Sequence, residues 1–339
     1  GGNPQLRTTE QAFGDKLHTY TIVDAITDKN VLPFRIDYVN TIRLPESLTD
    51  RQVSAIDTEQ ALMAPERIKQ VVGYTLEHFA QKTRRSERYA VGERRVHGFN
   101  ALFATASIDA ARRYYNQFGK QQWDTPPDRR LKVGLIYSYA ANAAEADDFF
   151  DNEGFETDNL SIDARDFLDD AIKDYNEMFG TSFDTSADKF QNYYKDLSQR
   201  LKNREIDLVI VVNMFLTGFD ATTLNTLWVD KNLRSHGLIQ AYSRTNRILN
   251  SVKTYGNIVS FRDLEQQTND AIALFGNRDA KGIVLLKPYA DYFDEYRTKV
   301  EELLTAYPSG SPIVGESAQK DFIALFGAIL RLRNILTSF

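Results

Sequence analysis

The sequence of 339 residues contains no cysteine, which excludes a disulfide framework, a cysteine-type zinc site and a thiol nucleophile. Its four histidines form no H-E-x-x-H or similar metal-ligand spacing, because they lie far apart at His18, His78, His97 and His236. No apolar run approaches the roughly 20 residues that a membrane-spanning helix requires, and the amino end has no signal-peptide pattern. These absences are typical of an intracellular protein without a histidine or cysteine metal cluster.

Phosphate-binding motifs are absent as well. The one Gly-Lys pair, Gly119-Lys120, is followed by glutamine and lacks the upstream glycine of G-x-x-x-x-G-K-[ST]. Neither a D-E-x-[DH] box nor an E-x-K nuclease pattern occurs in the sequence. The chain therefore cannot by itself hold a nucleoside triphosphate and its metal as a P-loop enzyme does. Because the formal net charge is −6, any contact with a polyanion must come from local patches.

The composition is that of an ordinary globular protein, with 42% hydrophobic and 26% charged residues. The length suggests two domains, or one large domain with an appendage. Buried-strand patterns occur at 100–106, 132–139, 207–215, 224–229 and 257–261. Helical patterns lie between them at 108–118, 163–179, 189–202 and 238–247. Strands that alternate with helices predict an α/β fold with a doubly wound parallel sheet.

The flanking segments carry weaker signals. Residues 17–42 are predicted to form short β-rich pieces, and a helix is expected from Pro65 to about residue 83. We expect 44–57 to be an exposed connection and the acidic stretch 140–160 to be a surface insertion. After residue 261 the patterns are helical, at 264–275, 289–307 and 321–339. The last of these is apolar and has no stop signal, which predicts that the chain is truncated at its carboxyl end.

The most informative segment is Gln-Ala-Tyr-Ser-Arg-Thr-Asn-Arg at 240–247. In a helix, Gln240, Arg244 and Arg247 stand at i, i+4 and i+7 and share one face. The planar fork of an arginine matches phosphate oxygens and stays charged at any working pH. The pair therefore indicates contact with a nucleoside triphosphate, although surface salt bridges explain the two arginines equally well.

Two predicted strand ends offer further contacts. Thr217, Gly218 and Asp220 follow a parallel strand, where open α/β sheets bind ligands. Gly218 lets the backbone approach a phosphate, Thr217 offers a hydroxyl donor, and Asp220 accepts from a ribose hydroxyl. Thr105 and Ser107 end another strand and begin a helix, as at a phosphate site. The alternatives are an ordinary turn after the first strand and plain helix capping by Ser107.

The densest basic run is Lys-Thr-Arg-Arg-Ser-Glu-Arg at 82–88. A solvated helix surface is the simpler interpretation of this run, and contact with nucleic acid is the alternative.

Together these motifs resemble the motor (R) subunit of type I restriction–modification enzymes, a superfamily 2 helicase-like translocase. The resemblance runs over nearly the whole chain. It is most specific in the strings ALFATAS at 101–107, VNMFLTGFD at 212–220 and HGLIQAYSRTNR at 236–247. It implies a RecA-like parallel sheet flanked by helices, followed by an incomplete all-helical region.

The resemblance also implies a domain organisation. Residues 1–95 would be the connection from a first motor lobe, 96–265 the second RecA-like lobe, and 266–339 the start of a helical domain. The P-loop lobe and the nuclease domain of the family are missing from this sequence, so we expect the chain alone to be inactive as an ATPase and a deoxyribonuclease. ATP and Mg²⁺ would be held mainly by the missing lobe.

For the nucleotide, the resemblance implies that Arg244 and Arg247 are arginine fingers that reach the γ-phosphate. Gly218, Asp220 and Gln240 would contact the rest of the bound nucleotide. The expected partners are double-stranded DNA and the modification and specificity subunits, in the cytoplasm of a prokaryote.

For DNA, the resemblance implies that Thr105, Ser107 and Thr217 grip duplex phosphates, a contact without sequence preference. Two other functions stay open at this point. One is a non-catalytic α/β docking module for subunit assembly. The other is a self-sufficient dinucleotide-binding enzyme, which the absence of G-x-G-x-x-G argues against.

Overall fold

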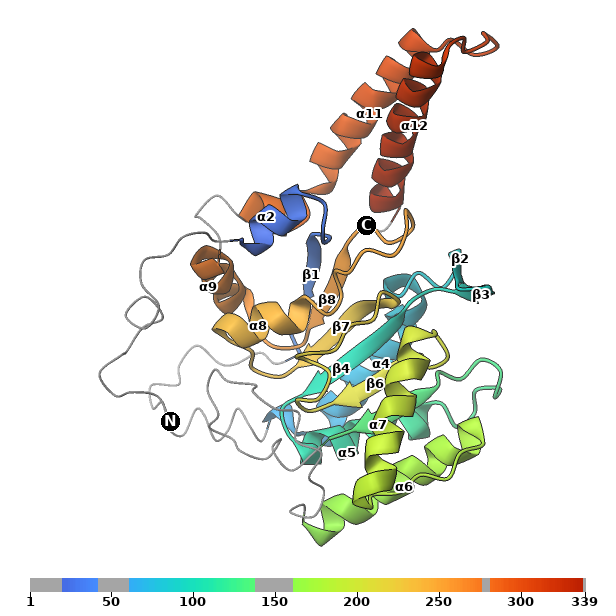
Figure 1. The fold of residues 1–339 in the computed structure, drawn as a ribbon. Coiled ribbons are helices and arrows are strands. Elements are labelled where there is room, and N and C mark those ends of the chain that lie inside the picture. Colours follow the sequence, from blue (N-terminus) through green and yellow to red (C-terminus); the bar gives the residue numbers. More distant parts are fainter. Residues whose placement is uncertain (1–19, 42–60, 138–160, 276–280, 338–339) are drawn as a thin grey trace, which may run out of the picture.

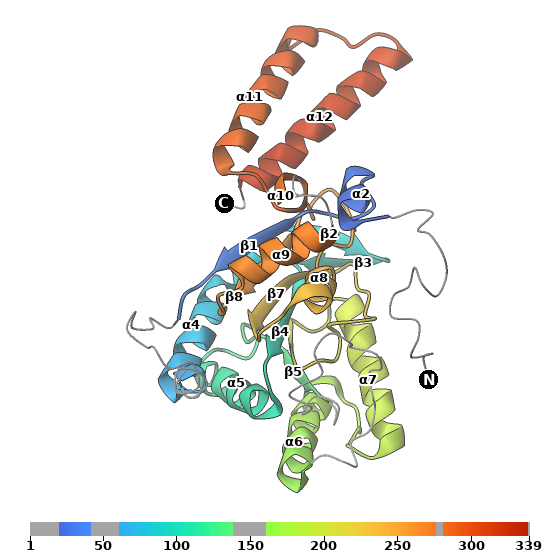
Figure 2. The same ribbon diagram turned by 90° about the vertical axis from the view of Figure 1, so that its left-hand side faces the viewer.

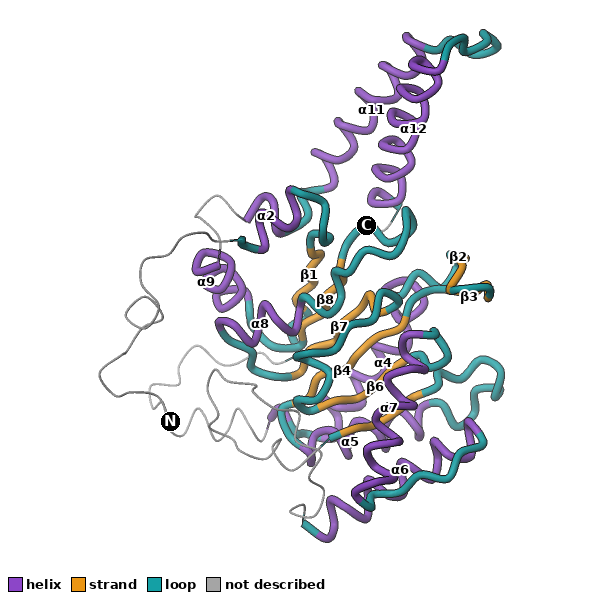
Figure 3. The backbone as a smooth tube through the Cα atoms, in the orientation of Figure 1, coloured by secondary structure: helices purple, strands orange, loops and turns teal. Residues whose placement is uncertain are grey.

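A computed structural model describes residues 20–41, 61–137, 161–275 and 281–337. Its centre is a six-stranded sheet in the order β1-β8-β7-β4-β6-β5, in which all neighbours are parallel (Figure 1, Figure 3). The strands are β1 (Phe34–Tyr38), β4 (Asn100–Thr105), β5 (Val133–Ile136), β6 (Leu208–Val211), β7 (Leu224–Asp230) and β8 (Gly256–Ser260). All five predicted strands lie in this sheet, which confirms the predicted parallel α/β fold. A separate antiparallel pair, β2 (Arg88–Val91) and β3 (Arg94–His97), was not predicted.

Helices cover both faces of the sheet, with α4 and α5 on one side and α7 on the other (Figure 2). Because both faces are covered, every residue of β4, β6 and β7 is buried. The helices of the described residues are α2 (Ile22–Thr27), α4 (Pro65–Lys82), α5 (Ile108–Gln121), α6 (Ile162–Phe179), α7 (Ala187–Lys202), α8 (Ser235–Tyr242), α9 (Glu265–Phe275), α10 (Lys281–Val284), α11 (Tyr289–Ala306) and α12 (Glu316–Leu336). Pro65 begins α4, and the Ser107 hydroxyl accepts from the Ala110 amide (3.2 Å), so both predicted helix starts are confirmed.

The expectation of β-rich structure over 17–42 is wrong for residues 22–27, which form α2. Thr21 and Asp24 make a capping box that starts this helix. The Thr21 hydroxyl accepts from the Asp24 amide (3.3 Å), and the Thr21 amide donates to the Asp24 carboxylate (2.7 Å). The later β-rich piece is the strand β1, which lies at the sheet edge beside β8. The predictions for 44–57 and 140–160 lie outside the described residues.

The basic run at 82–88 is a solvated surface only at its end, where Arg88 is exposed. Lys82 is 9% exposed and pairs with Asp37, and Arg84 is 8% exposed and donates to the Val252 carbonyl (2.7 Å). These cations are therefore used inside the fold, where they join the end of α4 to β1 and to the segment before β8.

The helices α11 and α12 pack against each other as a hairpin that projects from the sheet (Figure 1). The Tyr307 hydroxyl donates to the Ala318 carbonyl (3.1 Å), and the Tyr307 ring meets the Phe322 ring edge-on at 5.3 Å. The predicted helical region after the sheet is thus confirmed. Among the helices described, none is long and apolar enough to cross a membrane.

Candidate functional site

Three parallel strands end side by side at one edge of the sheet. β4 lies between β7 and β6, and its last residue, Thr105, pairs with Asp230, the last residue of β7. Ala104 pairs with Val211, the last residue of β6. Because these strands are parallel, the segments that follow them begin at the same edge, where open α/β sheets bind ligands.

The segment after β6 is a tight loop that presents the predicted turn. Gly218 has φ +66°, a left-handed conformation that glycine adopts without strain, and no atom lies within 4 Å of where a Cβ would stand. The Phe219 amide donates to the Thr217 carbonyl (2.7 Å), which closes the turn. The buried rings of Phe215 and Phe219 lie 4.5 Å apart and anchor the loop in the core. Gly218 and Asp220 remain exposed.

The predicted helix over 238–247 is wrong at its carboxyl end. α8 ends at Tyr242, so Arg244 and Arg247 do not share a helical face with Gln240. Gln240 itself is exposed on α8, as predicted, and Leu238 is buried on the opposite side.

Tertiary contacts explain this early helix end. The Leu32 amide donates to the Asn246 carbonyl (2.8 Å), and Asn246 Nδ2 donates to the Leu32 carbonyl (3.1 Å). The same segment packs tightly on Gly256, where an added Cβ would lie 2.3 Å from Thr245 Oγ1. The chain after Tyr242 therefore leaves the helix in a turn and packs against Leu32 and the first residue of β8.

The two arginines nevertheless meet the loop after β6. Arg244 Nη1 donates to the Phe219 carbonyl, and Arg244 Nε donates to the Gln240 carbonyl (3.1 Å). Arg247 Nε lies 3.3 Å from Asp220 Oδ1, and these two side chains are 40% and 62% exposed. The pair is partly exposed: Arg247 Nε is buried and makes no hydrogen bond to any described residue, whereas the Asp220 carboxylate is open to solvent. A surface pair of this kind contributes about 0–1 kcal/mol, so Arg247 can exchange Asp220 for another anion at little cost. We call Gly218, Asp220, Gln240, Arg244 and Arg247 the arginine rim.

The three predicted hydroxyls differ in accessibility. Thr105 is fully buried, and its hydroxyl lies 3.1 Å from the Val211 carbonyl and 3.3 Å from the Ser107 carbonyl. Because this hydroxyl is used inside the fold, Thr105 positions the turn before α5 and is not open to a phosphate. Ser107 and Thr217 are half-buried and reach the surface, and the Ser107 hydroxyl caps α5.

A buried ionic cluster beside this edge was not predicted. Asp230 is 2% exposed and accepts two hydrogen bonds from Arg67 (2.8 and 3.0 Å), one from Arg262 (2.6 Å) and one from the Tyr114 hydroxyl (2.6 Å). Burial raises the pKa of Asp230, but the hydrogen bonds from Arg67 and the charges of both arginines outweigh burial and hold this pKa below its ordinary value. Arg67 and Asp230 are 163 residues apart in sequence, so no local pattern indicates the cluster.

Two lysines hold the loop after β6 at its two ends. Lys231 is half-buried, and its ammonium donates to the Val212 carbonyl (3.1 Å) and to Asn213 Oδ1. Lys253 is 1% exposed, and its ammonium donates to two carbonyls at the start of β7 (2.8 and 2.7 Å). Burial lowers the pKa of Lys231 to about 8 and holds the pKa of Lys253 well below its ordinary value.

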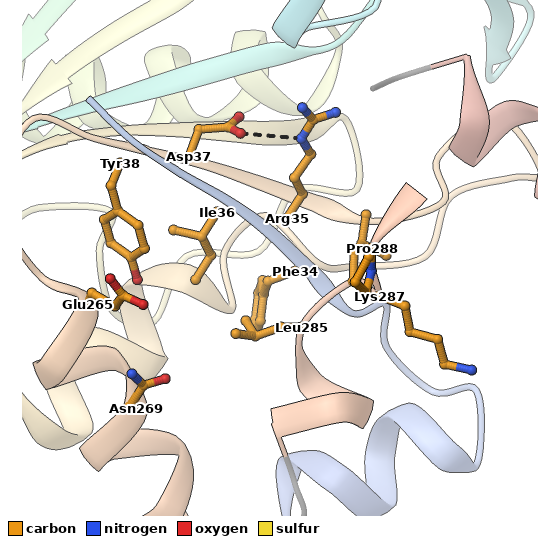
Figure 4. Close-up of a pocket in the computed structure, with 11 residues that line it drawn as sticks. Phe34, Arg35, Ile36, Asp37, Tyr38, Glu265, Asn269, Leu285, Lys287 and Pro288 are labelled. Atoms are coloured by element: carbon orange, nitrogen blue, oxygen red, sulfur yellow. Dashed lines mark ion pairs between the residues drawn. The ribbon is translucent and has the colours of Figure 1, made fainter. Parts of the chain in front are cut away.

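A pocket of about 430 Å³ lies against the edge strand β1 (Figure 4). It is lined by β1, by α9 and by residues 285–288, and the Leu286 amide donates to the Phe34 carbonyl beside it (2.8 Å). None of the predicted site residues lines this pocket. Within the described part of the chain, no group of three or more histidine, aspartate or glutamate side chains is arranged to hold a metal ion.

Comparison with known proteins identifies the family. Residues 97–263 match the family model described as type I restriction enzyme subunit R domain 3, and residues 284–339 match the model of the subunit R carboxyl terminus of type I restriction and modification enzymes. The chain is 38% identical to the type I restriction enzyme SsaAORF53P endonuclease subunit of Staphylococcus saprophyticus. It is 34% identical to the SauCOLORF180P endonuclease subunit of Staphylococcus aureus (strain COL). Each alignment covers 98% of this chain and 34% of the relative.

The solved structure of the ATP-dependent type ISP restriction-modification enzyme LlaBIII bound to DNA aligns with 97% of this chain and 19% of that chain. Its TM-score of 0.37 and identity of 13% are too low to carry an argument. The chain spans about a third of the length of the curated relatives it matches. On the two family models and these identities, the chain belongs to the R (endonuclease) subunit family of type I restriction enzymes.

Proposed function

We propose that this chain is the second motor lobe of an ATP-dependent double-stranded DNA translocase, within the endonuclease subunit of a type I restriction system. The contact between the two arginines and the loop after β6 carries this proposal. It joins residues from two separate motifs into one rim beside the strand ends. The rim is partly exposed, so the first lobe, which holds ATP, has access to it.

In this proposal Arg247 acts as the arginine finger. It is bound to Asp220 by a single, partly exposed ion pair, which is weak enough to be replaced by the γ-phosphate of ATP. Arg244 donates to two carbonyl groups of the chain and thereby fixes the loop against α8. Asp220, once released by Arg247, is available to accept a hydrogen bond from the ribose, and Gln240 lies nearby on α8.

Magnesium is assigned to the other lobe. The rim holds one carboxylate, that of Asp220, and the described residues include no group of three potential metal ligands. A metal ion that accompanies ATP would therefore take its protein ligands from the lobe that binds the triphosphate. On the DNA side, Ser107 and Thr217 would bind duplex phosphates without reading the sequence.

The test is Arg247→Ala in the intact subunit. We expect DNA-stimulated ATP hydrolysis to fall by about 10³-fold or more, as for arginine fingers elsewhere, with duplex affinity nearly unchanged. Arg94→Ala is the matched control. Arg94 is also exposed and ion-paired (3.0 Å to Glu205), but it lies on β3, before the start of β4, and is not part of the arginine rim. An Arg247→Ala subunit that hydrolyses ATP at the wild-type rate would contradict the assignment of Arg247 as the finger.

A docking function is the second candidate, and the helical hairpin favours it. Several large apolar side chains of α11 and α12 are exposed, among them Phe293 (45%), Leu304 (57%) and Ile323 (68%). An apolar surface of this kind suits contact with other subunits of a restriction complex. Salt separates the two functions, because binding to DNA phosphates weakens steeply as salt rises and apolar docking does not.

A further inference from the structure

Lys231 is a half-buried cation that has no carboxylate within ion-pair distance among the residues that the structure describes. Taking an ammonium group out of water costs free energy, which an anion normally offsets. The ammonium has three N–H donors, and within the described ranges it donates to the Val212 carbonyl and the Asn213 amide oxygen alone. Both acceptors are neutral, so they do not cancel the charge.

The carboxylate nearest in sequence is already committed. Asp230 directly precedes Lys231, but Arg67 and Arg262 share it at 2.8 and 2.6 Å. Lys253, the other lysine that holds the loop, is fully buried. The charge of Asp220 raises the pKa of Lys253 and so opposes the effect of burial. Lys231 therefore differs from its neighbours in lacking a counter-charge while remaining reachable from solvent.

Lys231 lies directly at the predicted DNA-binding edge. Its backbone follows β7, whereas its ammonium reaches the end of β6, and β4 lies between these strands. Neighbouring strands are about 4.8 Å apart, so the ends of β7 and β6 are separated by roughly 10 Å, and the Lys231 side chain together with its hydrogen bond to Val212 spans this separation. Ser107 follows the end of β4, and Thr217 lies in the loop that begins at Val212. The Lys231 ammonium is thus held at the edge of the sheet from which the segments that carry Ser107 and Thr217 begin.

We propose that Lys231 binds a backbone phosphate of duplex DNA, together with Ser107 and Thr217. The proposal rests on the proposed function and adds the charged group that its DNA contact otherwise lacks. A phosphate from a nucleotide is the other source of the same chemistry. DNA is favoured because Lys231 is bound to the Val212 end of the loop, whereas Arg244 and Arg247 hold its Phe219 end.

Salt titration of DNA binding tests this proposal. The 339-residue chain is titrated against a fluorescein-labelled duplex of arbitrary sequence at several salt concentrations, and binding is followed by anisotropy. Each phosphate neutralised on B-DNA contributes about −0.9 to the slope of log K against log[salt]. We expect Lys231→Met to reduce the magnitude of the slope by about 0.9 and to weaken binding several-fold at low salt, whereas Lys231→Arg preserves the slope.

Two further variants separate a phosphate contact from an anchoring role. Asn213→Ala removes one acceptor of the ammonium but keeps its charge, so it should leave the salt slope unchanged. Lys320→Met, on the exposed surface of α12, is the control for general loss of positive charge. Equal loss of affinity in Lys231→Met and Asn213→Ala, with an unchanged slope, would show that Lys231 only anchors the loop and would overturn the proposal. Thermal melting of each variant checks that it is folded.

The same variant distinguishes a phosphate of DNA from a phosphate of a nucleotide. If Lys231→Met keeps the DNA salt slope but weakens binding of ATP to the intact subunit, the phosphate belongs to a nucleotide and the DNA assignment is wrong. A wild-type chain that shows no salt-dependent binding to duplex DNA contradicts the DNA part of the proposed function and removes the basis of the Lys231 proposal. Salt-dependent binding by the wild type with an unchanged Lys231→Met slope contradicts the Lys231 proposal alone.

Discussion

Replacing Asp230 by asparagine should destabilise the chain strongly. The side chain lies at the end of the central strand β7 and joins α4, α5 and the end of β8 through four hydrogen bonds. Asparagine has nearly the same size as aspartate, so the change removes the charge without opening a cavity. It also turns one acceptor oxygen into an NH₂ group that faces guanidinium donors.

The expected magnitude follows from the burial of the partners. Arg67 is 5% exposed and Arg262 is 8% exposed, so both guanidiniums stay in the interior after Asp230 loses its charge. Breaking a buried ion pair by removing one partner costs about 3–5 kcal/mol. For a domain of this size, 1 kcal/mol lowers the melting temperature by roughly 2–4 °C, so we expect a fall of about 10 °C.

Thermal unfolding followed by circular dichroism measures this effect on the 339-residue chain. Asp109→Asn is the matched control, because Asp109 pairs with Arg113 at 3.0 Å on the exposed surface of α5. An exposed pair of this type contributes about 0.3–0.5 kcal/mol, so its loss should shift the melting temperature by only about 1 °C. If Asp230→Asn and Asp109→Asn shift the melting temperature equally, the buried cluster does not contribute as we have argued.

Three other predictions concern stability and the site. The pKa of Asp230 is lowered in the folded chain. The contribution of its charge to folding stability is therefore complete above the ordinary aspartate pKa of about 3.9 and is lost as pH falls through the folded pKa. The difference in melting temperature between wild type and Asp230→Asn should shrink when melting is measured in acid. Gly218→Ala should cost about 1–2 kcal/mol in chemical denaturation because of its φ of +66°, although no neighbour clashes with the new methyl group. Gly256→Ala should cost about 1–3 kcal/mol because its Cβ would lie 2.3 Å from Thr245 Oγ1. It should also lower ATP hydrolysis by the intact subunit, since the displaced segment carries Arg247; unchanged stability and turnover would mean that this close packing is not required.

The strands were predictable because each is short, apolar and closely followed by a turn signal. Residues 208–211 form an unbroken buried run, and in a doubly wound sheet this pattern has few alternatives. The turn at Gly218 was predictable for the same reason, since glycine at a strand end marks a position of positive φ. Local signals therefore located this strand and the loop that holds Thr217 and Asp220, although the strand predicted over 207–215 ends earlier, at Val211.

The helix over 238–247 was mispredicted because the competing interaction is distant in sequence. Periodicity favours continuation through Arg247, but Asn246 binds Leu32, which lies 214 residues earlier in the chain. The segment 22–27 was mispredicted for a different reason. Its Thr, Ile and Val residues favour a strand, whereas the capping box of Thr21 and Asp24 starts a helix.

The sequence gives the chemical type of a charged or polar residue, but its role also depends on whether the fold buries it. Thr105 has the hydroxyl that a phosphate contact needs, but its place at the end of the central strand β4 directs the hydroxyl to Val211. Lys231 appeared in the sequence as one lysine among many, and only the fold shows its ammonium crossing from β7 to β6. Side-chain chemistry at a strand end therefore depends on whether the strand lies at the centre of the sheet.

The loop after β6 has a consequence for how nucleotide and DNA contacts are linked. Its start is bound by Lys231, and its end by Arg244 and by the ion pair of Arg247. Between these points, the buried rings of Phe215 and Phe219 pack against each other, which leaves the backbone little freedom to deform locally. A shift of the arginine rim on meeting ATP would then move Thr217 and the phosphate contact in the same direction, because a stiff loop transmits displacement rather than absorbing it. In the proposed motor lobe, this loop would couple the two ligands through one short segment, without requiring the whole sheet to change shape.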